Sequence, residues 1–509
     1  MTLANVSGVR GRWYAALAGA LFPLCFAPFH AWYLAILLFA ALFHLWDGQS
    51  AREAAWRGFW FGFAAFATGT YWLYISIHVF GGAPVIVAIT LMLGLFWLMA
   101  VYIAGSGYLA ACMGSRPAAL RWCLFWPALF VVFEWVRGWM FTGFPWLTVG
   151  YGQIDGPLRG WAPAMGVHAV SFVTIVLGGV LLSLVRGTRA DRIIAAGVCI
   201  VLLGTTAVLY DRAWTHALPQ NLRVSLIQGS ISQDRKWLPE QRRPTLDLYR
   251  ELTLGLPNQD LVVWPEVAIP TLAYVVQDFL GELAVQAQAR GMQIYLGILT
   301  MDDASGRYRN SLLGVGRYDA VYHKRHLVPF GEFFPVPDFV RRWMRGQGLP
   351  NQDTLAGSYT QEALPIGQFL MSPSICYEDA YGAEQLDFLP RAHLLINVSN
   401  DAWFGDSIAP QQHLQIARMR ALEAGRFMLR ATNTGVTAVI SPRGEIMRQS
   451  PQFETHVLSA VVQPYTGQTP YVRFGNYGVL ITCLVLIGSG GYLARRQSVY
   501  ASNKEPQQE

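Results

Sequence analysis

Three ionisable residues each stand beside a short apolar run in the second half of the chain. Cys376 ends an apolar run that begins at residue 368, Glu266 follows the run 261–264, and Lys324 lies in the fragment VYHKRHLVPFGEFFP. An apolar run that stops at an ionisable residue is typical of a buried strand that presents that side chain at its end. Because parallel strands expose their carboxyl ends on one side of a sheet, we expect the three side chains to meet.

Together these residue types could carry out acyl transfer. A thiol of reference pKa about 8.5 needs a base or a cation nearby to become a nucleophile. Glu266 could accept the proton, while Lys324 would favour the thiolate and then stabilise the oxyanion formed when an acyl carbonyl is attacked. The backbone N–H of Tyr377 is the natural second oxyanion donor. No His/Cys cluster has the spacing of metal ligands, so we expect neither a metal nor another cofactor.

Each residue taken alone has a plainer interpretation. Cys376 could be a small buried hydrophobe, and Lys324 could belong to a solvated basic turn or contact a lipid phosphate. Glu266 could cap a helix, and Glu332 in PFGEF could be a loop carboxylate. Only the combination indicates catalysis.

Composition places the chain in a membrane. Of its 509 residues 53% are hydrophobic and only 14% charged, which is too apolar for an ordinary soluble protein. The formal net charge is +6, but the basic residues are dispersed among loops between apolar spans. Without a basic patch, a nucleic-acid partner is not expected.

The apolar stretches predict eight transmembrane helices, since a bilayer core takes roughly 20 helical residues. The predicted spans lie near 12–29, 31–46, 58–80, 84–112, 121–137, 162–185, 193–210 and 475–494. Arginines gather in every second loop, which places both termini in the cytoplasm by the positive-inside rule. The first span lacks an A-x-A-like cleavage site, so we expect an anchor and not a removed signal peptide.

Between the seventh and eighth spans the pattern changes to short β-rich runs that alternate with helical segments, which predicts an α/β domain. Seven crossings would place this domain outside the cytoplasm. The predicted organisation is a transmembrane domain over 1–210, the α/β domain over 211–470, an eighth transmembrane helix over 471–496 and a cytoplasmic tail over 497–509.

The order of three motifs resembles the nitrilase, or carbon-nitrogen hydrolase, superfamily. The motifs are WPE at 264–266, HK with LVPFGE at 323–332, and CYE at 376–378. Over residues 220–465 the resemblance implies an αββα sandwich with Cys376 as nucleophile, Glu266 as general base and Lys324 as oxyanion stabiliser. It further implies that Glu332 is a supporting second glutamate. Tyr377 and Glu378 would shape the cysteine site.

The transmembrane spans narrow the resemblance to the bacterial apolipoprotein N-acyltransferases. The segments IQGSISQDRKW at 227–237 and VSNDAWFGDS at 398–407 are similar to that family. The resemblance implies a monomeric inner-membrane enzyme with a periplasmic catalytic domain. It would transfer the sn-1 acyl chain of a phospholipid, expected to be phosphatidylethanolamine, through a thioacyl-Cys376 to the α-amine of a diacylglyceryl-cysteine apolipoprotein.

Several aromatic residues are candidates for lipid contact. By the resemblance, Trp237 contacts substrate. In the loop segment 134–151, Trp139, Phe144 and Trp146 could form either an interfacial aromatic belt or a substrate gate. Glu134 and Arg137, in the same segment, could form a structural ion pair or contact a headgroup; charges within a membrane favour the functional interpretation.

Residues 337–350 resemble a short interfacial helix. Phe339 and Trp343 stand among arginines, as expected for aromatics in acyl chains with cations at phosphate level. We predict a mobile lid over Cys376, with Gly346 and Gly348 as hinges.

Two other functions remain open at this stage. The same three catalytic residues could serve a membrane-anchored amidase or nitrilase that uses water as the second nucleophile. A transporter or scaffold with a degenerate sensor domain would keep the fold without the chemistry, and Cys376→Ala would then leave its function intact. The number of spans favours the transferase, because a hydrolase of soluble substrates needs one anchor at most.

Overall fold

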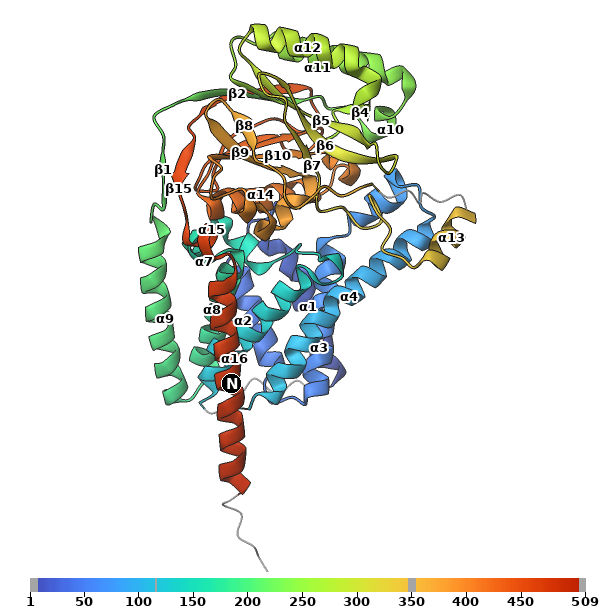
Figure 1. Cartoon of the computed structure of the whole chain (residues 1–509). Helices are drawn as coiled ribbons and strands as arrows, with labels where there is room; N and C mark the ends of the chain where they lie inside the picture. The colour runs from blue at the N-terminus through green and yellow to red at the C-terminus, as the bar shows by residue number, and fades with distance from the viewer. Residues whose placement is uncertain (1–7, 115–116, 347–353, 503–509) are drawn as a thin grey trace, which may run out of the picture. The chain divides into compact units, whose positions relative to one another are not determined.

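The computed structural model describes residues 8–114, 117–346 and 354–502 of the chain, which form two compact units (Figure 1). The helical unit comprises the described residues up to Tyr74, Ala83–Ala213, and those from Phe474 onward. The α/β unit comprises Ile75–Gly82 and the described part of Trp214–Arg473.

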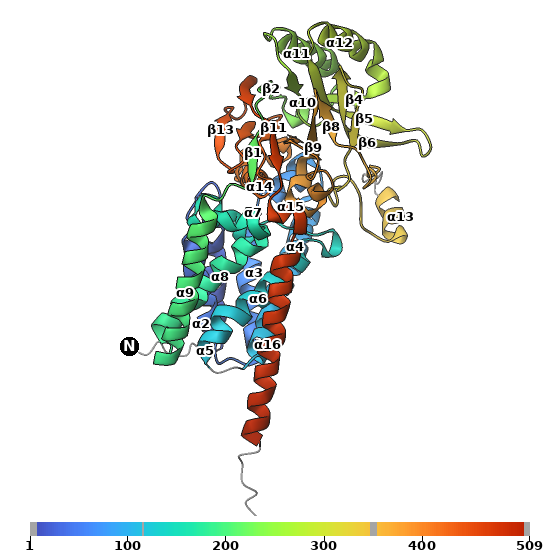
Figure 2. The ribbon, with the colours of Figure 1, turned by 60° about the vertical axis from the view of Figure 1, so that its left-hand side comes forward.

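The helical unit is built from apolar helices that pack on one another, with α3 against α4 and α16 against α6 (Figure 2). Its helices are α1 (Val9–Leu21), α2 (Leu34–Trp46), α3 (Ala51–Gly69), α4 (Val85–Cys112), α5 (Ala118–Leu120) continued by η3 (Arg121–Phe125) and α6 (Trp126–Arg137), α7 (Trp161–Met165), α8 (Val167–Arg186), α9 (Arg189–Tyr210) and α16 (Tyr477–Ser502). Short 3-10 turns connect them at η1 (Phe22–Cys25), η4 (Met140–Thr142), η5 (Val149–Asp155) and η6 (Pro157–Gly160).

Five helical segments among the described residues are long and apolar enough to cross a membrane. They are Val85–Cys112, Ala118–Arg137, Val167–Arg186, Arg189–Tyr210 and Tyr477–Arg496. Each overlaps a predicted span. The apolar helix Leu34–Trp46 is shorter. These helices support several membrane crossings, while the predicted number of eight stays a prediction.

Some predicted span boundaries differ from the helices. The prediction for 58–80 is wrong at its end, because α3 ends at Gly69 and the π-helix η2 (Ile75–Phe80) groups with the α/β unit. There the Ser76 hydroxyl donates to the carbonyl of Trp403 at 2.8 Å. The first span is also interrupted, since α1 ends at Leu21 and the chain continues as the 3-10 turn η1. Apolar composition alone does not mark where a helix gives way to another conformation.

The α/β unit contains two main sheets and a small strand pair. In the first sheet the order is β14 (His456–Val462), β2 (Leu222–Gln228), β3 (Leu261–Val263), β5 (Gln293–Asp302), β6 (Arg307–Gly316) and β7 (Val321–His323), with β4 (Ile269–Leu272) paired to β5. In the second the order is β13 (Ile446–Gln449), β12 (Ala438–Ile440), β11 (Met428–Thr432), β10 (Leu394–Ser399), β9 (Phe369–Ile375) and β8 (Leu364–Ile366). The pair is β1 (Thr215–Ala217) with β15 (Tyr465–Gly467).

Helices cover the outer face of each main sheet, with α11 (Arg242–Leu254) and α12 (Gln277–Ala289) on the first and α14 (Ala409–Ala424) on the second. The other helical segments of this unit are α10 (Gln233–Lys236), η7 (Pro239–Gln241), η8 (Ala273–Val276), α13 (Asp338–Gly346), η9 (Cys376–Ala380), η10 (Gly382–Asp387), η11 (Asp401–Phe404) and α15 (Pro470–Phe474), whose last residue falls in the helical unit. Leu246 of α11 and Leu283 of α12 pack on the first sheet, whereas Leu414 of α14 packs on the second. A third apolar core, which includes Leu226 and Ile396, fills the space between the sheets. The predicted αββα sandwich is thus confirmed.

The sandwich corrects our reason for expecting the three residues to meet. Glu266 follows β3, which lies parallel to β2 and β5 in the first sheet. Lys324 follows β7, which is antiparallel to β6. Cys376 follows β9, in the second sheet. The residues therefore approach from two facing sheets and not from one parallel edge.

Candidate active site

Cys376 stands at a sharp turn between β9 and η9. Its φ of 54° lies in the left-handed region, which is uncommon for a residue other than glycine and is held only when neighbouring groups require it. The carbonyl of Cys376 accepts from Asn397 Nδ2 at 3.4 Å and lies 3.3 Å from His413 Nε2. The turn leaves Cys376 as a partly buried residue at the end of the strand.

The carboxylate of Glu266 is buried among hydrogen-bond donors. Its Oε1 accepts from Asn310 Nδ2 at 2.7 Å and from Lys324 Nζ at 3.3 Å. Its Oε2 accepts from the backbone N–H of Asn400 at 2.9 Å. These bonds fix both oxygens, so the predicted base is held in one orientation.

Lys324 joins the two glutamates. Its Nζ lies 2.9 Å from Glu332 Oε1, and the other oxygen of Glu332 accepts from the Val328 N–H at 2.8 Å. Asn310 Nδ2 also reaches Glu332 Oε1 at 3.2 Å. Burial by itself would lower the pKa of Lys324, but Glu332 and Glu266 outweigh it and raise that pKa above the usual range. Lys324 is therefore a permanent cation, and Glu332 helps to keep it so.

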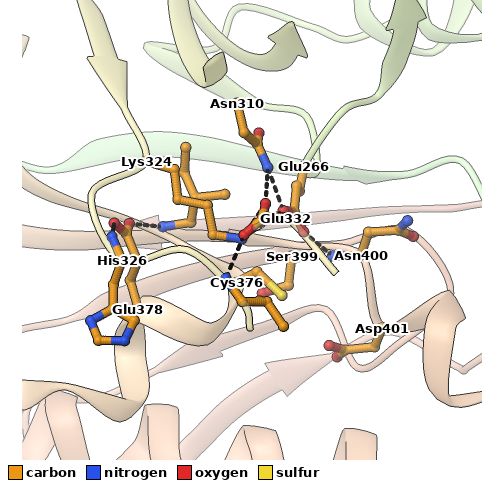
Figure 3. Close-up of polar contacts among 12 residues, drawn as sticks. Glu266, Asn310, Lys324, His326, Glu332, Cys376, Glu378, Ser399, Asn400 and Asp401 are labelled. Atoms are coloured by element: carbon orange, nitrogen blue, oxygen red, sulfur yellow. Dashed lines mark hydrogen bonds and ion pairs between the residues drawn. The ribbon is translucent and has the colours of Figure 1, made fainter. Parts of the chain in front are cut away.

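The side chains of Glu266, Lys324, Glu332 and Cys376 converge in Figure 3. Burial raises the pKa of the Cys376 thiol well above its usual value, and the Glu266 carboxylate raises it further, whereas Lys324 offsets only part of this. Lys324 thus favours the thiolate as predicted without being able to maintain it in the resting protein. A thiol in this state would have to lose its proton before or during any attack, and Glu266 is a carboxylate of this cluster that could accept it.

Glu378 connects the two sheets beside the thiol. One carboxylate oxygen accepts from the backbone N–H groups of Arg325 at 2.6 Å and His326 at 3.1 Å, directly after β7. The other accepts from the N–H of Ile375 at 2.7 Å, at the end of β9. The Tyr322 hydroxyl donates to both oxygens at 3.0 Å. Glu378 therefore holds the chain around Lys324 against the chain around Cys376.

The predicted lipid contacts have varied surroundings. Trp237 is 50% exposed directly after α10, Phe339 is 66% exposed on α13, and Trp139 is 52% exposed. Trp146 is only 2% exposed and stacks on Phe144 with ring centroids 6.1 Å apart. The side chain of Trp343 and the whole of Gly348 lie outside the described residues. None of these positions tests lipid contact, which stays a prediction.

Glu134 and Arg137 both bind the backbone of the following loop. Glu134 accepts from the N–H of Val149 at 2.8 Å. Arg137 donates to the carbonyls of Phe144 at 2.6 Å and Trp146 at 2.7 Å. These contacts favour a structural role, so the headgroup interpretation has no support from the geometry.

Sequence reasoning missed three polar residues of the site. Asn310 and Asn400 bind Glu266, and the buried Lys236 donates to the carbonyl of Glu266 at 3.3 Å. One signal was available for Lys236. The chain has only three lysines among 38 basic residues, and Lys236 and Lys324 are two of them. Burial lowers the pKa of Lys236 to about 8, although Glu266 and Cys376 oppose this shift.

The sandwich and its Glu-Lys-Cys cluster define the carbon-nitrogen hydrolase class, and the family described as "Carbon-nitrogen hydrolase" matches residues 223–471. The family described as "Apolipoprotein N-acyltransferase N-terminal domain" matches residues 18–180. Three relatives named apolipoprotein N-acyltransferase match nearly the whole chain. The protein from Methylococcus capsulatus is 39% identical and covers 97% of this chain and 98% of its own. Those from Pseudomonas aeruginosa and Vibrio cholerae are 41% and 40% identical, over 94% and 91% of this chain and 96% and 93% of their own.

The chain therefore belongs to the apolipoprotein N-acyltransferase family. Its apolar helices agree with a multi-pass membrane enzyme, and its class of reaction is acyl transfer.

Proposed function

We propose that the chain transfers the sn-1 acyl chain of a phospholipid to the α-amine of a diacylglyceryl-cysteine apolipoprotein, through a thioester on Cys376. The observation that carries the proposal is the convergence of the Cys376 thiol with an oriented carboxylate, Glu266, and a buried cation, Lys324 (Figure 3). A nucleophile, a base and an oxyanion stabiliser are what acyl transfer requires. Family membership supplies the acceptor.

In the first half-reaction Glu266 takes the thiol proton while Sγ attacks the ester carbonyl carbon. The negative charge on the carbonyl oxygen is stabilised by Lys324 and by the N–H of Tyr377. The ester C–O bond then breaks, and the lysophospholipid leaves with the proton from Glu266. The thioacyl-enzyme remains.

In the second half-reaction the α-amine of the apolipoprotein attacks the thioester carbonyl. An α-amino group has a pKa near 8, so a useful fraction is neutral at about pH 7. Glu266 accepts the amine proton, the C–S bond breaks, and Cys376 recovers its proton as the amide is released. Water is a competing acceptor, so positioning of the amine has to favour aminolysis.

The lipid substrates require access from a bilayer. We place the enzyme in a bacterial inner membrane with cytoplasmic termini and the α/β unit in the periplasm, on the arginine distribution of the loops. Trp237, Phe339 and Trp343 are proposed to contact lipid near the thiol, with α13 as a mobile lid. Trp139, Phe144 and Trp146 are proposed for the membrane interface. We expect phosphatidylethanolamine as donor and a monomer as the working form.

Intact-mass spectrometry tests the proposal directly. The purified wild-type protein and Cys376→Ala are incubated with phosphatidylethanolamine, and hydroxylamine is then added. We expect a hydroxylamine-labile acyl adduct on the wild type alone, discharged by a diacylglyceryl-Cys peptide and stable to water. Rapid discharge by water would favour a lipid hydrolase, and the absence of an adduct on active protein would exclude the covalent mechanism.

A further inference from the structure

We propose that His413 is a positioning residue for the oxyanion donor Tyr377 N–H, on which it acts through the carbonyl of Cys376. This inference rests on the proposed acyl-transfer function and assigns a role to a residue outside the Glu-Lys-Cys cluster. The carbonyl of Cys376 and the N–H of Tyr377 belong to one peptide group. Whatever holds the carbonyl therefore also sets the direction of the N–H.

The imidazole of His413 lies between two buried carboxylates. Its Nδ1 is 2.8 Å from Asp401 Oδ1, and its Nε2 is 2.9 Å from Asp379 Oδ1. A neutral ring would turn a lone pair toward one of these carboxylates, so both nitrogens carry protons. The Nε2–H is shared with the carbonyl of Cys376 at 3.3 Å, which brings a cation to the peptide that follows the nucleophile.

Arg430 completes this group. Its Nη1 lies 3.0 Å from Asp379 Oδ2, and its Nη2 lies 3.1 Å from Asp401 Oδ2. Nη1 also donates to Asn397 Oδ1 at 2.6 Å, which leaves the Asn397 amide N–H to point at the carbonyl of Cys376 at 3.4 Å. Two carboxylates balance two cations, so the group is neutral and resists rearrangement. We call Asp379, Asp401, His413 and Arg430 the support cluster.

The support cluster draws on distant parts of the second sheet and its covering segments. Asp379 belongs to η9, Asp401 to η11, His413 to α14 and Arg430 to β11, and each is at most 1% exposed. Elsewhere α14 packs apolar side chains such as Leu414 and Ala417 on the sheet. Well-packed apolar residues would be at least as stable as buried charges at such a depth. Charges beneath the nucleophile therefore indicate a task other than packing.

That task follows from peptide geometry. In a trans peptide the C=O and N–H point in opposite directions, so a carbonyl fixed toward His413 turns the N–H of Tyr377 the other way. Donation to the carbonyl also polarises the peptide and strengthens its N–H as a donor. Electrostatics agree, because Asp379 and Asp401 overcome burial and the nearby Arg430 cation to raise the pKa of His413 to about 9.

The test compares two reactions of the same thiol. Acylation by phosphatidylethanolamine passes through an oxyanion, whereas alkylation by iodoacetamide does not. In His413→Gln we expect the acylation rate at saturating phospholipid to fall about 10- to 100-fold. This is less than the rate loss expected when an oxyanion donor is removed altogether, because the Tyr377 N–H is still present. KM for the phospholipid and the alkylation rate of Cys376, followed by peptide mass spectrometry, should stay within about threefold of wild type.

His393→Gln is the matched control, since His393 directly precedes β10 at the strand end opposite Asn400. It should leave both rates within about threefold of wild type. If His413→Gln does not fold, the double variant Asp401→Asn with His413→Gln keeps the buried charges balanced, and the same selective loss of acylation is expected.

Equal losses of acylation and alkylation in the folded variant would overturn the proposal, because the thiol itself would then be displaced. Unchanged acylation would overturn it as well. Failure of the proposed function looks different, since the wild type would then take no acyl group from phospholipid. In that case p-nitrophenyl hexanoate would replace the phospholipid as acyl donor, because its reaction also passes through an oxyanion. The acylation and alkylation rates of Cys376 would then be compared as before.

Discussion

Two buried groups of charges flank Cys376 and differ in how well each charge is satisfied. The catalytic cluster consists of Lys236, Glu266, Lys324 and Glu332. The support cluster consists of Asp379, Asp401, His413 and Arg430. In the support cluster each carboxylate contacts both cations. In the catalytic cluster Lys324 contacts two carboxylates, whereas Lys236 donates to the backbone carbonyl of Glu266.

The pKa shifts express the same difference. The fold raises the pKa of His413 and, despite burial, lowers the pKa of Asp401 through the nearby His413 and Arg430, so it prefers the charged form of both. Burial instead lowers the pKa of Lys236 to about 8 and raises the pKa of Cys376, so it disfavours their charged forms. Near the reacting atoms the fold thus disfavours the charges of Lys236 and Cys376, whereas in the support cluster each carboxylate has two cationic partners. We infer that the stable support cluster holds the backbone in place around the more reactive groups of the catalytic cluster.

The largest effect is expected for Glu266→Gln. The amide preserves size but cannot accept the thiol proton, so single-turnover acylation should slow by about 10²- to 10⁴-fold. Intact-mass spectrometry at timed intervals measures the rate. Glu251→Gln, on the exposed side of α11, is the matched control and should acylate like the wild type. A rate for Glu266→Gln within tenfold of wild type would remove Glu266 from the mechanism.

Lys324→Met should slow acylation by about 10²- to 10³-fold, because the oxyanion loses its cation. It also leaves the carboxylates of Glu266 and Glu332 facing each other, which should lower the free energy of unfolding by about 3 kcal/mol. Chemical denaturation measures the second effect. Lys324→Arg keeps the charge and should recover most of the stability but less of the rate. Loss of activity in Lys324→Met without any loss of stability would contradict the charge balance described for this cluster.

The support cluster should make stability depend on pH in a defined direction. The pKa of His413 rises from its reference value of 6.5 to about 9 on folding. Its stabilisation is therefore complete below about pH 6.5 and is lost as pH rises toward about 9, by about 3 kcal/mol in all. The difference in unfolding free energy between wild type and His413→Gln isolates this contribution. A difference that grows with pH would contradict the assignment of His413 as a cation.

Of the variants considered, Lys236→Met should have the smallest effect on the acylation rate. Unlike Lys324→Met, it should raise the stability of the fold. The folded-state pKa of about 8 means that the charge on Lys236 costs stability below pH 8, a cost relieved as pH rises toward 10.5. At pH 7 the free energy of unfolding of Lys236→Met should exceed that of the wild type by about 1–3 kcal/mol, because methionine carries no buried charge. Acylation should slow about tenfold as Cys376 loses a nearby cation. Lower stability in Lys236→Met would show that the amine is satisfied after all.

Local sequence was sufficient for much of the architecture. Apolar runs located the strands before Glu266 and Cys376, because a buried strand is recognisable from the pattern of neighbouring apolar residues. Composition located the membrane helices for the same reason, although it did not place the end of α3 at Gly69. The resemblance of three short motifs then put Glu266, Lys324 and Cys376 in one site, where the structure brings them together.

Tertiary structure alone decided how the site is held. Which strands face one another depends on packing between two sheets, so the origin of Lys324 and Cys376 in different sheets left no local signal. Asn400 is 134 residues from the Glu266 that it binds, and His413 is 37 residues from the carbonyl of Cys376. Polar partners so distant in sequence meet only when burial forces every donor and acceptor to be satisfied. The sequence by itself determined which residues could react, and the folded chain decided their orientation and charge.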